Sequence, residues 1–187
     1  MRITYLTILF VLILGSKMQA QSDLLFTKTG HIYFISHTDI IDIDANNNQV
    51  GSILNTKTGE IVFTLLMKSF EFKLALAYEH FNENYVESHL YPKSKFNGSI
   101  LNIKTVDFSK DGIYLVDVDG DLSIHGQTKK IKTSGTISIK EGKVYAKSNF
   151  EIALADYKIE VPYLVKDRVA QKIQIQVNMT YEPYHLK

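Results

Sequence analysis

Two histidines and two glutamates lie close together in the stretch HFNENYVESHLYP, at residues 80–92. His80, Glu83, Glu87 and His89 carry imidazole and carboxylate groups, which bind zinc and similar ions. On a helix the first three would share one face, whereas His89 would point elsewhere, because only residues three and four apart are neighbours. No HExxH or comparable compact motif is present. The favoured interpretation is therefore no metal site, with Glu83 and Glu87 facing water and the stretch forming an amphipathic cover.

Other reactive residue types are spread along the chain without a catalytic pattern. The G-x-S-x-G elbow of many hydrolases is absent. Asp117, Asp119 and Asp121 alternate along one expected strand and lack the glycine and glutamate spacing of an EF-hand loop. His125 stands beside Gly126 and is most simply a turn residue. With no cysteine in the chain, thiolate chemistry is excluded. The sequence predicts no enzyme and no resident cofactor.

Apolar and polar residues alternate over most of the chain, most regularly in its second half. A period of two predicts antiparallel strands with one dry and one wet face. The segments HGQT (125–128) and KEGK (140–143) are typical of hairpin turns. This pattern favours an all-β barrel or sandwich. The expected strands cover residues 31–37, 48–55, 59–67, 96–103, 114–124, 131–139, 144–154 and 173–181.

Two segments break the strand pattern. In residues 68–90, Phe70, Leu74 and Phe81 approximate helical spacing, which predicts a short helical insertion between strands. Residues 155–171 form a second irregular connection. The chain contains no internal repeat and no linker, so we expect a single domain.

The first twenty residues resemble a secretory signal. Arg2 precedes an apolar run of twelve residues, 3–14, which is too short to span a bilayer. We expect residues 1–20 to be a signal peptide cleaved after Ala20, with the domain in residues 21–187. The protein would then be periplasmic or secreted, without a transmembrane segment in the mature chain.

The charge balance and the aromatic content narrow the function further. The chain has 21 basic and 20 acidic residues, which disfavours a nucleic-acid partner. Its 11 tyrosines and 10 phenylalanines are enough to line a sizeable cavity. Without cysteines, the stability of an exported domain must come from apolar burial.

Alternation alone leaves open which face of a barrel is dry. An outer-membrane barrel turns its apolar face toward lipid. Here the polar face carries long charged side chains and the chain has no tryptophan, so a soluble barrel with an apolar interior is favoured. The charged positions are Lys130, Lys132, Lys140, Lys143 and Lys147.

Three stretches resemble the YceI-like domain family, in family order over roughly residues 26 to 182. They are YP…F (Tyr91, Pro92, Phe96), G-x-L-x-x-H-G-x-T from Gly120 to Thr128, and a stretch from Phe150 to Pro162 that contains D-Y-x-I-x-x-P. The resemblance implies an eight-stranded antiparallel lipocalin-like β-barrel exported to the bacterial periplasm. It also implies a long isoprenoid or other amphiphilic chain bound in the interior, without turnover.

We therefore predict a protein that holds a polyisoprenoid or lipid for transport, storage or sequestration. Small inward residues such as Gly120 and Gly135 leave room for a ligand. The alternative is a non-catalytic periplasmic stress or scaffold protein with a filled core, and whether the chain forms a homodimer stays open.

The predicted ligand-binding residues lie in the barrel interior and at its mouth. Polar groups at the mouth, with His80, Tyr85 and Tyr157 as candidates, would recognise the head group. The full set is Phe34, Phe63, Phe70, Phe72, Leu76, His80, Phe81, Tyr85, Phe96, Tyr114, Val116, Val118, Leu122, Val144, Phe150, Ile152, Tyr157, Ile173, Ile175 and Val177.

Overall fold

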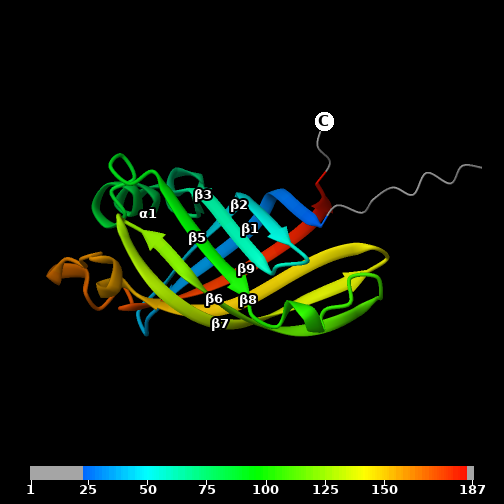
Figure 1. Cartoon of the computed structure of the whole chain (residues 1–187). Helices are drawn as coiled ribbons and strands as arrows, with labels where there is room; N and C mark the ends of the chain where they lie inside the picture. Colours follow the sequence, from blue (N-terminus) through cyan, green and yellow to red (C-terminus); the bar gives the residue numbers. More distant parts are fainter. Residues whose placement is uncertain (1–22, 185–187) are drawn as a thin grey trace, which may run out of the picture.

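The computed structural model describes residues 23–184, so the expected signal peptide and its cleavage site lie outside the described residues. The sheet has nine strands in the order β1-β9-β8-β7-β6-β5-β3-β2-β4, and β1 also pairs with β2. Because β4 is only a two-residue strand beside β2, the other eight close into an antiparallel barrel (Figure 1). The predicted eight-stranded barrel is confirmed. Its strands are β1 Leu24–His37, β2 Asp42–Asn55, β3 Glu60–Leu66, β4 Glu71–Phe72, β5 Lys93–Ile100, β6 Gly112–Ile124, β7 Gln127–Lys140, β8 Lys143–Ala153 and β9 Lys172–Pro183.

The hairpin turns expected in the second half are present. His125 and Gly126 join β6 to β7 with φ of 50° and 68°, and Glu141 and Gly142 join β7 to β8 with φ of 52° and 74°. Two-residue hairpins favour positive φ at both positions, because that backbone twist matches the twist of the strands. A glycine at the second position makes this conformation easier to adopt.

The first two strands are longer than expected, beginning at Leu24 and Asp42 rather than at residues 31 and 48. Register shifts on both sides of Gly30 interrupt the alternation in β1. In β2 the run DANNNQV resembles a turn, yet Asn47 is fully buried. Its side-chain amide donates to the carbonyl of Leu66 at 3.1 Å, and its side-chain oxygen accepts from the backbone N–H of residue 49 at 2.9 Å. A satisfied amide can remain inside a strand.

The insertion between β3 and β5 contains the predicted helix. It comprises the 3₁₀ turn η1 (Met67–Ser69), the helix α1 (Ala75–His80) and a π-helical turn, η2 (Phe81–Tyr85). The long connection between β8 and β9 carries the 3₁₀ turns η4 (Leu154–Tyr157) and η5 (Tyr163–Val165). A further 3₁₀ turn, η3 (Ile103–Thr105), lies between β5 and β6.

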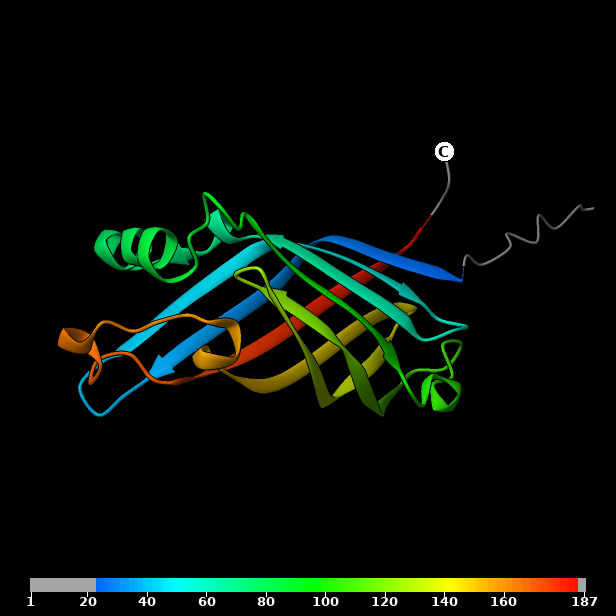
Figure 2. The same cartoon turned by 60° about the vertical axis from the view of Figure 1, so that its left-hand side comes forward.

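The two ends of the barrel differ. One end is packed: Val50, Leu54, Ile137 and Met179 are at most 2% exposed, and the buried Tyr181 hydroxyl lies 2.7 Å from the hydroxyl of Ser52. At the other end lie α1, the β1–β2 turn and the β8–β9 connection (Figure 2). We call this second end the mouth, formed by residues 38–41, 74–85 and 158–171.

Candidate ligand-binding cavity

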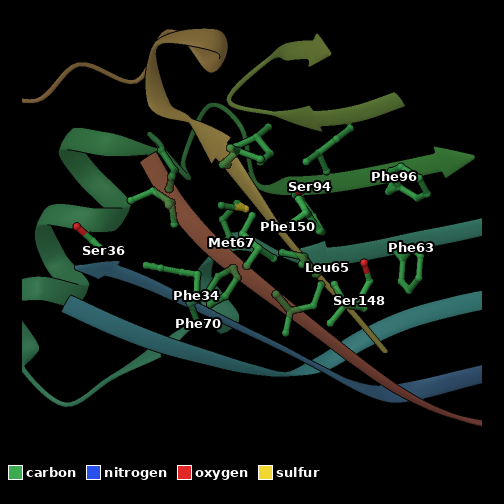
Figure 3. A pocket seen from close by; sticks show the side chains of 18 of the residues that line it. Phe34, Ser36, Phe63, Leu65, Met67, Phe70, Ser94, Phe96, Ser148 and Phe150 are labelled. Carbon is green, nitrogen blue, oxygen red and sulfur yellow. The ribbon is translucent and has the colours of Figure 1, made fainter. Parts of the chain in front are cut away.

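The barrel encloses a cavity of about 430 Å³ with mostly apolar walls. Figure 3 shows rings from separate strands gathered around it, among them Phe34, Phe63, Phe96 and Phe150. The volume lies within the range of about 300–1,000 Å³ typical of small-molecule sites.

The cavity reaches the surface at the mouth. Its lining residues Ile41, Leu74 and Leu76 are 39%, 61% and 61% exposed. Because the far end is packed, a ligand that enters here meets a blind, apolar chamber.

Most residues expected at the site surround this cavity, although they come from six long strands and from the insertion. The alternation of each strand places every second side chain inside, and the closure of the barrel brings them together. The structure places the following predicted residues in the cavity wall: Phe34, Phe63, Phe70, Phe72, Leu76, His80, Phe81, Tyr85, Phe96, Val116, Val118, Leu122, Phe150, Ile152, Ile173, Ile175 and Val177.

Three predicted positions are not among the residues that line this cavity. Tyr114 is near the packed end, where its hydroxyl donates to the carbonyls of Asp107 and Lys110. Val144 is buried at the same end. Tyr157 is 1% exposed in η4 and does not face the cavity. Alternation gives the face of a residue but not its height along the barrel. This explains why Tyr114 and Val144 face inward but lie at the packed end.

Small residues do not all create space. A Cβ added to Gly120 would lie 2.5 Å from Cζ of Phe96, and one added to Gly98 would lie equally close to the same atom. These glycines are cross-strand partners, and the Phe96 ring covers both of them. Gly120 therefore accommodates an aromatic ring rather than a ligand, which corrects the expectation for this residue.

Three serine hydroxyl groups in the wall are already hydrogen-bonded within the protein. Ser36 accepts from the backbone N–H of Ala170 at 2.8 Å, and Ser94 donates to the carbonyl of Ser123 at 3.0 Å. Ser148 donates to a carbonyl of β7 at 2.8 Å. Groups that are satisfied in this way do not require a polar ligand, so the chamber suits an apolar one.

An aromatic cluster fixes the insertion to the barrel. The centroid of the Phe34 ring in β1 lies 5.2 Å from that of Phe70 and 5.5 Å from that of Phe81, and Phe81 lies 5.1 Å from Phe72. This packing holds the nearby His80 and Tyr85 in the cavity wall. Burial raises the pKa of Tyr85, so its phenol stays protonated and can donate a hydrogen bond.

The barrel wall is interrupted between β7 and β8. Their ladder runs from Lys140 only to Gly135, which pairs with Ser148. Beyond this point the strands diverge, and η4 packs against both of them. The sequence gives no signal for this gap, because alternation continues along both strands.

His125 connects three separate segments near the mouth. Its Nδ1–H donates to the carbonyl of Tyr157 in η4 at 2.9 Å, and its Nε2 lies 2.7 Å from a carboxylate oxygen of Glu87. Its ring also packs edge-on against Tyr91, with the centroids 4.8 Å apart. His125 is a turn residue as expected, but its side chain also joins the β6–β7 turn to the insertion and to η4.

The constellation in residues 80–92 does not form the expected helix face. The helical segment ends at Tyr85 and Glu87 has a positive φ, so Glu87 turns toward His125 instead of water. His80 lines the cavity, whereas Glu83 and His89 are exposed. Within residues 23–184, no three histidine, aspartate or glutamate side chains gather closely enough to hold a metal ion. No helix of this part of the chain is long and apolar enough to cross a membrane.

The fold and the cavity define a β-barrel of the lipocalin-like class that encloses an apolar cavity. More particularly, the chain belongs to the YceI-like domain family, whose model matches residues 20–181. No curated protein matches the chain.

Solved structures with the same fold include proteins from three bacteria. A polyisoprenoid-binding domain from Saccharophagus degradans is 15% identical, with a TM-score of 0.75 over 88% of this chain and 100% of that one. BcnA of Burkholderia cenocepacia is 12% identical, with a TM-score of 0.64 over 82% and 96%. A mutant YceI protein of Campylobacter jejuni, solved with a monobromobimane guest, is 15% identical, with a TM-score of 0.60 over 80% and 91%.

Proposed function

We propose that this protein is an exported binding protein that holds a long apolar or amphiphilic chain, a polyisoprenoid or another lipid, without transforming it. The observation that carries the proposal is the apolar chamber of about 430 Å³, packed at one end and open at the mouth. The similar fold of the polyisoprenoid-binding domain of S. degradans supports the same class of ligand.

The size of the chamber sets the scale of the affinity. A volume of about 430 Å³ corresponds to roughly fourteen groups the size of a water molecule, at about 30 Å³ each. Burying about ten methylene groups contributes roughly 8 kcal/mol, which corresponds to a Kd of about 1 μM before the cost of association. A longer chain would extend through the mouth, where exposed Leu74 and Leu76 would cover part of it.

The cavity disfavours the alternative of a scaffold with a filled core.

Export is also part of the proposal, and it is supported by the sequence pattern of residues 1–20. If export is correct, intact mass of protein from the periplasmic fraction will show a chain that begins close to Gln21. A chain that retains Met1 in that fraction would refute cleavage.

Lipid extraction and mass spectrometry of natively purified protein test the binding itself, together with uptake of the neutral apolar dye N-phenylnaphthylamine. In the variant Val118→Phe, a ring would occupy the cavity, and we expect loss of dye uptake. Leu115→Phe on the same strand is the matched control, because Leu115 is 77% exposed on the outer face. Circular dichroism would check that both variants fold.

Two results would overturn the proposal. One is repeated recovery of an empty barrel that takes up neither dye nor lipid. The other is a folded Val118→Phe variant that binds as well as the unmodified protein.

A further inference from the structure

The charged residues that line the cavity all belong to the basic type. His80, Lys95, Lys147 and Arg168 line it, whereas none of the aspartates and glutamates of the described part of the chain does. The whole chain carries 20 acidic and 21 basic residues, so acidic groups are excluded from the cavity wall rather than scarce.

Of these basic residues, only two stand at the mouth. Lys95 and Lys147 are exposed on β5 and β8, in positions that alternate with inward side chains. His80 is the last residue of α1, and Arg168 follows η5 in the β8–β9 connection. Both segments lie at the same end of the barrel (Figure 2), and residues of both line the cavity.

The backbone around Arg168 is fixed on both sides. Its N–H donates to the carbonyl of Val165 at 2.9 Å, and the N–H of Ala170 donates to the hydroxyl of Ser36 in β1 at 2.8 Å. Val165 and Val169 line the cavity next to Arg168. The guanidinium is therefore carried by an anchored turn on the rim of an apolar chamber.

The guanidinium of Arg168 is also not paired with an acidic side chain among the described residues. Four of the described lysines form ion pairs, among them Lys73 with Asp44 at 3.2 Å and Lys172 with Glu151 at 2.9 Å. The neighbouring Lys166 lies 4.4 Å from the centroid of the Tyr163 ring. None of the ion pairs among residues 23–184 involves Arg168. A guanidinium offers a planar fork of donors that matches a carboxylate or a phosphate.

From these observations we infer that the bound chain carries an anionic head group, a carboxylate or a phosphate, and that Arg168 binds it at the mouth. The inference rests on the proposed function, because the apolar part of the same molecule occupies the chamber. His80, at the end of α1 on the mouth, supplies a second hydrogen-bond donor toward the same head group. A cationic head would meet only like charge among the charged lining residues.

The test compares ligands with one chain and different heads. Dodecanoic acid, dodecyl phosphate and dodecanol compete with N-phenylnaphthylamine, which is neutral and so does not depend on Arg168 for its own charge. We expect the unmodified protein to prefer an anionic ligand over the alcohol by about tenfold, equivalent to about 1.4 kcal/mol. The preferred anion identifies the head as carboxylate or phosphate.

Variants of Arg168 test whether this residue causes the preference for an anionic head group. Arg168→Gln should abolish the preference for the anion and leave the affinity for dodecanol unchanged, whereas Arg168→Lys should retain part of it. Lys104→Gln is the control, since Lys104 lies in η3 away from the cavity, and it should change neither value. Equal binding of acid, phosphate and alcohol, or an unchanged preference in Arg168→Gln, would overturn the inference alone. Failure of all three ligands, dodecanol included, would overturn the proposed function and the inference with it.

Discussion

Replacement of His125 by asparagine should release the contact that joins the insertion, the β6–β7 turn and η4. Residue 125 has a φ of 50°, a conformation that asparagine tolerates better than most residues do. The substitution therefore removes the imidazole while it keeps the turn. Alanine would add backbone strain to the same change.

The contacts of His125 in the structure set the expected loss in the free energy of unfolding. The hydrogen bond from His125 to the carbonyl of Tyr157 contributes about 1 kcal/mol, and a bond to the charged Glu87 about 1.5–3 kcal/mol. The edge-on contact with Tyr91 adds about 0.5–1.5 kcal/mol. Because the Glu87 side chain is 39% exposed, water can solvate it again once the imidazole is gone. We therefore expect a loss of about 3 kcal/mol, a large share of the roughly 5–15 kcal/mol of a typical domain.

Urea denaturation measures this loss as a lower midpoint with an unchanged slope. Hydrogen exchange should show faster exchange in η4 and at Ile159, whose N–H donates to the carbonyl of Leu154 at 3.1 Å. His89→Asn is the control, because His89 is exposed, and it should change stability by less than about 0.5 kcal/mol. A double-mutant cycle with Glu87→Gln should show coupling of at least about 0.5 kcal/mol. An effect of His125→Asn no larger than that of His89→Asn would refute the assigned role.

Gly120→Ala should destabilise the fold by about 1–3 kcal/mol, because its Cβ would lie 2.5 Å from Cζ of Phe96 and 2.6 Å from the carbonyl oxygen of Asn97. The control is Gly142→Asn, where no atom lies within 4 Å of an added Cβ, and it should be nearly neutral. Thermal unfolding of both variants measures these effects, and equal losses of stability in the two would contradict the packing argument. Burial raises the pKa of Tyr157 from 10.0 to about 12 and raises the pKa of Tyr181 as well. The folded state therefore keeps these protons when the unfolded chain loses them, so stability is complete below about pH 10 and falls as the pH rises toward 12. Urea midpoints measured between about pH 9 and 11 check this slope, and a flat profile that Tyr157→Phe leaves unchanged would count against it.

The sequence alone predicted the features that depend on neighbouring residues. Alternation with a period of two predicted the strands, and the segments HGQT (125–128) and KEGK (140–143) predicted the hairpins. Most of the residues that this periodicity and the family resemblance proposed for the site do line the cavity, although many other lining residues were not among them. These signals are local, because the side-chain direction in a strand follows from its own backbone.

Only the tertiary structure decided the features that depend on register and on distant contacts. The β1–β2 pairing closes the barrel, and the strand register places Tyr114 and Val144 at the packed end. Phe96 fills the space above Gly120, and β7 separates from β8 where η4 packs. His125 meets Glu87 across 38 residues of sequence. A local pattern determines which face of a strand is apolar, whereas the height of each residue and its partner across the barrel are set by how all the strands pair at once.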